Sequence, residues 1–142
     1  MKRYKDLYPC VTDIENIKKA IWCASKDKRK RKSVIRVLDD IDFYASKIQE
    51  LLISKSYVPS PYDKMTIYDG ARHKERIISK PRFYPDQCIH WSLMLVVEPL
   101  FEKRMYKWSC ASIKNRGIHY AKNYIVGALK DEHDTKYALQ LD

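Results

Sequence analysis

The sequence contains no apolar run long enough to cross a membrane. A spanning helix needs about 18 or more consecutive apolar residues, whereas the longest apolar segment, residues 89–97, contains His90 and Ser92. The N-terminus, Met-Lys-Arg-Tyr-Lys-Asp, also lacks the apolar centre of a secretory signal peptide. These absences predict a chain that has no membrane partner.

The cysteines lack the spacing of metal-binding and redox motifs. Cys10, Cys23, Cys88 and Cys110 form no Cys-x-x-Cys pair and no cysteine–histidine knuckle. Such spacings mark structural zinc sites and thiol redox motifs. We therefore expect a reduced, cytoplasmic chain whose cysteines are small, buried or half-buried apolar side chains.

Acidic residues are in the minority, because 28 lysines and arginines stand against 18 aspartates and glutamates, and the formal net charge is +10. The chain length of 142 residues suffices for one domain. A hydrophobic fraction of 45% is too high for a disordered basic tail, and a charged fraction of 32% is too high for a membrane protein. The composition predicts a soluble, basic, globular chain.

The positive charge lies in two blocks, residues 1–36 and 72–116. Within the first block, residues 26–32 read Lys-Asp-Lys-Arg-Lys-Arg-Lys, which puts six cations in seven residues. Such a run repels itself unless a polyanion neutralises it, and nucleic acid is the polyanion that accounts for it most simply. A solubilising loop or a localisation signal is the alternative. The candidate nucleic-acid ligands in this run are Lys28, Arg29, Lys30, Arg31 and Lys32.

The first third of the chain predicts two amphipathic helices. Thr12 followed by Glu15 is the pattern of a capping box, and apolar residues recur at helical spacing over residues 13–24. After the basic run, the same spacing continues over residues 33–54. We therefore expect a first helix over 13–24 and one long helix over 33–54.

Two short alternating segments, residues 65–68 and 74–78, flank the dipeptide Asp69-Gly70. Asp-Gly tolerates the positive φ angles of a tight turn, so the pattern predicts a β-hairpin whose loop extends through His73. Alternation along the second strand separates its side chains into two faces. One face carries Lys74 and Arg76, and the other carries Glu75 and Ile77.

A further helix is expected from Pro85 to about Met105. Proline is favoured in the first helical turn, and a second proline inside this helix, Pro99, is expected to kink it. A polar, basic loop follows over residues 107–117.

The C-terminal residues predict a short helix over 118–129 and a strand over 137–142, because the helical spacing of apolar residues gives way to alternation. The expected fold class is therefore α+β. The exposed edge of this final strand favours self-association of the chain, or fraying from about Asp131 onward.

Four aromatic or titratable residues are interpreted as structural. His90 lies on an otherwise apolar helix, where a hydrogen-bonded core or groove residue is commoner than a ligand. Trp22, Trp91 and Trp108 are expected to be core or partner-facing anchors. For Trp108, beside a lysine in the basic loop, stacking on a nucleic-acid base is the alternative.

The order of several segments resembles a known family. A basic helical arm precedes a hairpin of the form Lys-x-Arg-x-Ile-x-x-Pro, a helix reading Pro-Asp-Gln-Cys-Ile-His-Trp and ending Glu-Pro-Leu-Phe-Glu, a loop Ser-Cys-Ala-Ser-Ile-Lys-Asn-Arg-Gly-Ile-His-Tyr-Ala, and a strand ending Leu-Asp. Residues 55–142 resemble the fingers and early palm of bacterial reverse transcriptases of the retron, group II intron and diversity-generating retroelement types. Residues 1–54 match only in having basic helices. The order of the segments, and no single motif, carries the resemblance.

The resemblance implies roles for the cations of the hairpin and the loop. Lys74 and Arg76 match the cations that bind the triphosphate of the incoming dNTP, where fixed positive charge faces developing phosphate charge. An exposed hairpin edge that is charged against aggregation is the alternative for these residues. Arg116 matches a loop motif near the template and the nucleotide, although residues 113–115 depart from the intron enzymes and favour the retron or retroelement branch. The further candidate nucleic-acid ligands are Lys80, Arg82, Lys107 and Lys114.

The resemblance also implies a metal ligand at the end of the chain. Asp142 matches the first catalytic aspartate of the palm, which holds two Mg²⁺ ions between the attacking 3′-hydroxyl and the leaving pyrophosphate. The Tyr-x-Asp-Asp turn that supplies the other aspartates is absent, and the only Asp-Asp pair is Asp39-Asp40. We therefore expect the 142 residues alone to be inactive and to bind Mg²⁺ poorly.

The implied organisation has three regions: a basic helical region over 1–54, a fingers subdomain over 55–130 and an incomplete start of a palm over 131–142. The expected function is that of the N-terminal part of an RNA-directed DNA polymerase, a nucleotidyltransferase that binds template RNA, RNA/DNA hybrid and dNTP. Two alternatives stay open. One is a freestanding basic RNA-binding module or truncated retroelement relic, and the other is an interaction protein that is basic for unrelated reasons.

Overall fold

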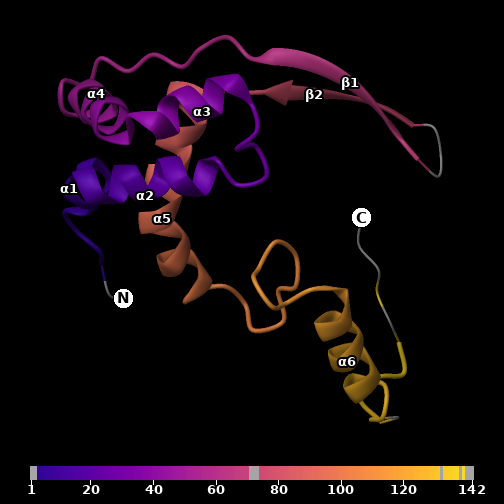
Figure 1. The fold of residues 1–142 in the computed structure, drawn as a ribbon. Helices are drawn as coiled ribbons and strands as arrows, with labels where there is room; N and C mark the ends of the chain where they lie inside the picture. Colours follow the sequence, from indigo (N-terminus) through magenta and orange to yellow (C-terminus); the bar gives the residue numbers. More distant parts are fainter. Residues whose placement is uncertain (1–2, 71–73, 132, 138, 140–142) are drawn as a thin grey trace. The chain divides into compact units, whose positions relative to one another are not determined.

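The computed structural model describes residues 3–70, 74–131, 133–137 and 139 (Figure 1). Helices and one antiparallel two-stranded sheet make up the described chain, which confirms the α+β class. In chain order the elements are α1 (Leu7–Thr12), α2 (Ile14–Ala24), α3 (Lys32–Asp39), α4 (Ile41–Ile53), β1 (Asp63–Asp69), β2 (Lys74–Lys80), η1 (Phe83–Gln87), α5 (Cys88–Glu102) and α6 (Ile118–Ala128).

Backbone contacts divide the chain into two compact units, Met1–Pro99 and Leu100–Asp142. The first unit contains α1 to α4, the hairpin, η1 and most of α5, and the second contains the end of α5 and α6. The three regions expected from the sequence, with boundaries at 54 and 130, divide the chain by function and not by backbone contacts. That division stays a prediction.

The helix expected over 13–24 is confirmed as α2, but its cap differs from the expected one. The hydroxyl of Thr12 donates to the carbonyl oxygens of Tyr8 and Pro9, at 3.2 and 3.3 Å, because Thr12 ends α1. Asp13 caps α2 instead, and its carboxylate accepts a hydrogen bond of 3.0 Å from the backbone N–H of Asn16. The expected capping box is therefore wrong by one residue. Asp13 has the extended backbone conformation that an N-cap requires, with φ −61° and ψ 134°.

The single long helix expected over 33–54 is wrong, because two helices, α3 and α4, occupy this stretch. The break falls at Asp40, whose backbone leaves the helical region with φ −137° and ψ 60°. Its carboxylate accepts a hydrogen bond of 3.3 Å from the N–H of Phe43 and so caps α4. Aspartate competes with the helix by bonding nearby backbone N–H groups, which the hydrophobic spacing alone does not reveal.

The core of the first unit lies among α2, α3, α4 and the start of α5 (Figure 1). Ile17 and Ile21 of α2 and Ile48 of α4 are completely buried. Burial of each such side chain stabilises the fold by about 1.5–3 kcal/mol. Cys88 and Ile89 of α5 join the same cluster, so a segment distant in sequence completes the core of the N-terminal helices.

The hairpin expected around Asp69-Gly70 is confirmed. Strands β1 and β2 pair in antiparallel register from Asp63 opposite Lys80 to Asp69 opposite Lys74. The expected loop through His73 falls on residues 71–73, which lie outside the described residues. Every residue of β2 is exposed.

The helix expected from Pro85 begins later, at Cys88, and ends at Glu102. The preceding residues form η1, a wide helical turn that is interrupted at Tyr84, with φ −120° and ψ 133°. Asp86 lies in η1 with only 1% of its surface exposed. The carboxylate of Asp86 therefore lies in the protein interior and not on an exposed first turn. Pro99 lies inside α5, as expected.

The second unit contains little buried surface. The helix expected over 118–129 is confirmed as α6, and none of its residues is buried. Trp108 packs on Tyr124 with ring centres 3.8 Å apart, nearly parallel at 22°. Of the strand expected over 137–142, Tyr137 and Leu139 are not in a strand, and the other four residues lie outside the described residues.

All four cysteines are free. Cys88 is buried, and this burial raises the pKa of its thiol to about 12. Cys23 and Cys110 are half-buried, whereas Cys10 is exposed, so the expectation of burial is wrong for Cys10. The reason is that α1 is short and buries only Val11 and Thr12. None of the helices in the described ranges is both long and apolar enough to span a membrane.

Candidate nucleic-acid interface

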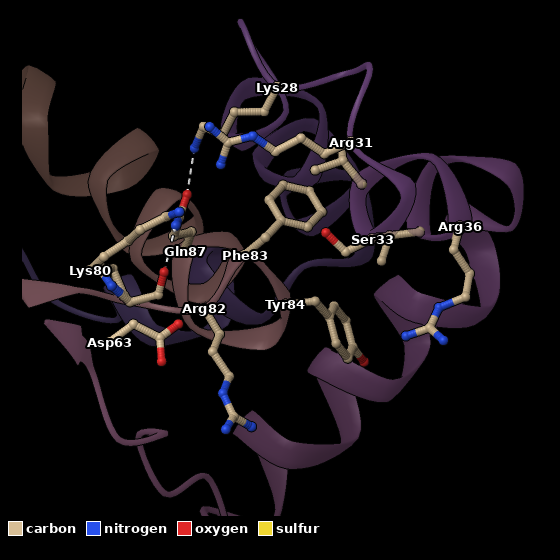
Figure 2. A pocket seen from close by; sticks show the side chains of 13 residues that line it. Lys28, Arg31, Ser33, Arg36, Asp63, Lys80, Arg82, Phe83, Tyr84 and Gln87 are labelled. Carbon is tan, nitrogen blue, oxygen red and sulfur yellow. Dashed lines mark hydrogen bonds between the residues drawn. The ribbon is translucent and has the colours of Figure 1, made fainter. Parts of the chain in front are cut away.

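A concave pocket lies where the hairpin leaves the helical core, and we call it the root pocket (Figure 2). Its volume is about 310 Å³. Four segments converge on it: the basic loop before α3, the first turns of α3, the start of β1, and the chain from the end of β2 through η1. Its lining consists of Lys28, Arg31, Ser33, Val34, Arg36, Val37, Asp63, Lys80, Pro81, Arg82, Phe83, Tyr84 and Gln87.

The root pocket carries an excess of positive charge. Five lysine and arginine side chains line it, against the single carboxylate of Asp63. Across the part of the chain that the structure describes, none of the five forms an ion pair. Uncompensated cations around a concave surface attract anions, because the surrounding protein focuses their field.

Lys28 is held in this pocket by Gln87. Its ammonium group donates a short hydrogen bond to the side-chain oxygen of Gln87. The amide nitrogen of Gln87 donates in turn to the carbonyl oxygen of Pro81, at 2.7 Å. The pKa of Lys28 is lowered, first by burial of its ammonium group and then by the nearby charges of Arg31 and Lys80. Gln87 thus ties the basic loop to the chain that leaves β2.

Asp86 makes a second connection at the other strand of the hairpin. Its Oδ1 accepts hydrogen bonds from the hydroxyl of Tyr57, at 2.6 Å, and from the N–H of Ser60, at 3.1 Å. Burial raises the pKa of Asp86, but the hydrogen bonds from Tyr57 and Ser60 and the nearby charge of His90 outweigh it, and the net pKa is lowered. Asp86 therefore anchors the extended segment that leads into β1.

Both connections come from adjacent residues of η1, so one turn holds both strands of the hairpin where they meet the core. Asp86 holds the segment before β1, and Gln87 holds the segment after β2. We call this pair the hairpin anchor.

The remaining residues of the basic loop lie outside the root pocket. The guanidinium group of Arg29 lies 3.9 Å from the ring centre of Trp22, a cation–π contact, and its Nε donates to the hydroxyl of Ser25 at 3.2 Å. Trp22 is 52% exposed, so it is a surface anchor and not a core residue. Lys30 and Lys32 are exposed.

Strand β2 carries its cations on one face. Because residues two positions apart share a face of a strand, Lys74 and Arg76 lie on the same face of β2 as Lys80. Lys80 lines the root pocket, whereas Lys74 and Arg76 do not. At about 3.3 Å per residue, the six steps from Lys74 to Lys80 span about 20 Å. The strand therefore carries a line of cations that ends in the root pocket.

The second unit holds the other candidate ligands. A guanidinium nitrogen of Arg116 donates to the carbonyl oxygen of Lys107 at 3.2 Å, and its charged carbon lies 5.8 Å from the ring centre of Tyr120. The ammonium group of Lys107 lies 4.6 Å from the ring centre of Trp108. Tyr124 stacks on one face of Trp108, which is therefore closed to a base. Lys114 is exposed.

The structure thus brings together four of the expected ligands in the root pocket: Lys28, Arg31, Lys80 and Arg82. Asp142 lies outside the described residues. Within the described residues, no group of three or more His, Cys, Asp or Glu side chains is arranged to hold a metal ion.

Sequence reasoning missed three residues of this site, Arg36, Asp86 and Gln87. Arg36 follows the basic run by one helical turn and could have been added to it on that spacing. No sequence signal marks Asp86 and Gln87. The partners of Asp86 lie 29 and 26 residues away in the chain, and Lys28, a partner of Gln87, lies 59 residues away.

Of the alternatives expected from the sequence, the structure shows a groove residue at His90 and excludes a core residue at Trp91. Both are exposed, and with Met94 and Glu98 they line a shallow groove on α5. Trp91 is 39% exposed, so it is not a core anchor, and His90 is a groove residue and not a core residue.

Comparison with known proteins leaves the chain without an assigned family. No protein-family model matches it. No curated protein matches it either.

Proposed function

We propose that this chain is the fingers part of an RNA-directed DNA polymerase. In this proposal Lys74 and Arg76 bind the triphosphate of the incoming dNTP, while the basic loop and the root pocket bind phosphates of the template RNA. The observation that carries the proposal is the position of Lys80. It lies on the same face of β2 as Lys74 and Arg76 and also lines the pocket that contains Lys28 and Arg31.

Two physical arguments support this proposal. Phosphate binding requires cations held in place before the ligand arrives, and the hairpin anchor holds the hairpin at both strands. Binding of an RNA strand requires cations for several successive phosphates, and the basic loop and the root pocket supply them.

The first test is RNA binding by the 142-residue chain. Fluorescence anisotropy with a labelled single-stranded RNA is expected to show binding whose logarithm falls linearly with the logarithm of salt concentration. An affinity that is unchanged between low and physiological salt contradicts a phosphate-binding role for the basic loop.

The second test concerns the nucleotide and needs the complete polymerase. There, Lys74→Gln combined with Arg76→Gln is expected to raise the KM for dNTP about tenfold or more, a free-energy change of about 1.4 kcal/mol, with little change in template affinity. The matched control is Lys64→Gln combined with Lys55→Gln, which removes the same charge from exposed positions outside the pocket. An unchanged KM in the hairpin variant overturns the nucleotide assignment.

A freestanding RNA-binding module is the second candidate function, and the root pocket favours it equally. The reading frame beyond codon 142 separates the two candidates. A Tyr-x-Asp-Asp sequence roughly a hundred residues further on supports the polymerase, because two Mg²⁺ ions need more carboxylates than Asp142 alone. A stop codon directly after Asp142 supports the binding module.

A further inference from the structure

The root pocket differs from the exposed cationic face of β2 in being concave. Lys74 and Arg76 lie on an exposed strand, where a nucleic-acid strand can pass in either direction. In the root pocket, by contrast, Pro81 and Phe83 form part of the wall, and cations reach it from the basic loop, from α3 and from the end of β2. Figure 2 shows Phe83 between the Lys28 and Arg31 side chains on one side and the Arg82 side chain on the other.

The charge of the root pocket suits a compact anion of high charge. An internal phosphodiester of RNA carries one negative charge, whereas a phosphomonoester carries about 1.5 to 2 negative charges and offers three acceptor oxygens. Five cations against one carboxylate are far more than one phosphodiester neutralises. Arginine adds geometric selectivity, because its planar fork binds two phosphate oxygens at once.

The first turn of α3 opens into the same pocket. Arg31 occupies the N-cap position of α3, and no side chain caps this end of the helix. Ser33, two residues further along the chain, lines the pocket with its neighbour Val34, whose N–H donates to the carbonyl oxygen of Arg31 at 2.9 Å. The other N–H groups in the first turn of a helix favour an anion, which adds to the attraction of the cations.

An aromatic ring completes the pocket. Phe83 is half-buried and lines the wall, and Tyr84 beside it is held by a hydrogen bond of 3.4 Å from its hydroxyl to the carbonyl oxygen of Tyr44. An aromatic face next to a phosphate site can stack a base without selecting its sequence. The volume of about 310 Å³ matches a small-ligand pocket and not a groove for a duplex.

We propose that the root pocket binds the phosphorylated end of a nucleotide, either the 5′-phosphate of an RNA or the phosphates of a free nucleotide. Lys28, Arg31, Lys80 and Arg82 contact the phosphate oxygens, and Phe83 contacts the terminal base. This inference rests on the proposed RNA-binding function and deepens it, because it names the part of the RNA that this pocket selects.

The experiment compares three labelled RNAs of one sequence that carry a 5′-hydroxyl, a 5′-monophosphate or a 5′-triphosphate. Anisotropy at physiological salt is expected to show about tenfold tighter binding of the 5′-phosphorylated RNAs than of the 5′-hydroxyl RNA. Arg31→Gln combined with Lys80→Gln is expected to abolish this preference. The charge-preserving variant, Arg31→Lys combined with Lys80→Arg, is expected to keep part of it.

The matched control removes the same charge from the outer part of the hairpin. Lys74→Gln combined with Arg76→Gln is expected to change the affinity for all three RNAs little and to leave the 5′-end preference unchanged. Circular dichroism of each variant confirms that the helices are retained. Equal affinity for the three RNAs overturns the proposal, and so does a preference that survives the Arg31 and Lys80 substitutions.

Competition with an unlabelled nucleoside triphosphate distinguishes the two sources of phosphate. Displacement of the 5′-phosphorylated RNA at micromolar nucleotide supports a free nucleotide as ligand, and no displacement supports an RNA end. If all three RNAs bind equally, the proposed function stands and this inference fails. If no RNA binds, the proposed function fails. Direct titration with the nucleoside triphosphate then tests the phosphate site of the root pocket separately. Binding that Arg31→Gln removes supports the site, and absence of binding overturns it.

Discussion

The helical core and the hairpin of the first unit are stabilised in different ways. Helices α2 and α4 pack together through completely buried side chains such as Ile21 and Ile48. Every residue of β2 is exposed, so the hairpin depends on its own backbone pairing and on the hairpin anchor, Asp86 and Gln87. The cations of β2 therefore lie on an element that contributes little to the core. Substitutions in the hairpin can therefore change binding without unfolding the protein, whereas substitutions in the core cannot.

The largest expected effect tests this contrast directly. Ile48→Ala, in α4, leaves a cavity in the core and is expected to lower the free energy of unfolding by about 2–5 kcal/mol. Ile77→Ala, in β2, is expected to lower it by less than about 1 kcal/mol, because Ile77 is 69% exposed. Urea denaturation followed by circular dichroism measures both. Equal losses would mean that the hairpin contributes to the core as much as α4 does.

The next largest effect on the free energy of unfolding is expected at the hairpin anchor. Asp86→Asn puts an amide nitrogen where the carboxylate has a buried oxygen without a hydrogen-bond partner in the described structure, and it weakens the bonds from Tyr57 and Ser60. We expect the free energy of unfolding to fall by about 1.5–3 kcal/mol. Asp39→Asn, at an exposed position, is the control and is expected to change it by less than about 0.5 kcal/mol.

The same aspartate makes stability depend on pH. Because the folded state lowers the pKa of Asp86, its contribution is fully present above the ordinary aspartate pKa of about 4 and is lost as the pH falls through the lower folded-state pKa. Denaturation series at pH 6 and below are expected to show a steeper acid loss for the native chain than for Asp86→Asn. Parallel pH profiles would contradict this assignment of the acid sensitivity to Asp86.

A smaller effect is expected at the other half of the anchor. Gln87→Ala removes the hydrogen bond to the carbonyl oxygen of Pro81 and the acceptor for Lys28. We expect a loss of about 1 kcal/mol in stability and faster amide hydrogen exchange in β2 than in α2. Unchanged exchange in β2 would show that Gln87 does not hold the strand.

The smallest expected effect on stability is the most informative for binding. Lys74→Gln and Arg76→Gln together are expected to change stability by less than about 0.5 kcal/mol, because both residues are exposed. Because the proposal assigns both residues to the dNTP, the slope of log affinity against log salt for single-stranded RNA is expected to stay unchanged. A slope shallower by about 1.4 would mean that each residue contacts one RNA phosphate.

Short-range patterns predicted much of this fold correctly. Residues 13–24 and 118–129 repeat apolar residues at helical spacing, and both form helices. The hairpin around Asp69-Gly70 follows from a turn dipeptide between two alternating segments. In these cases the information lies within a few residues, so periodicity suffices. It failed at Asp40, where a single hydrogen bond to the N–H of Phe43 caps a new helix inside a continuous apolar pattern.

The sequence by itself determined the excess of basic residues, the cationic face of β2 and the nature of most elements, because charge and periodicity are local properties of the chain. Only the tertiary structure decided which cations line the same pocket. Arg31 and Lys80 are far apart in sequence, and they line one pocket because Cys88 and Ile89 pack into the core of the N-terminal helices and bring η1 with them. Long-range burial of this kind depends on the shapes of all the packed side chains at once, and therefore no short segment of the sequence encodes it.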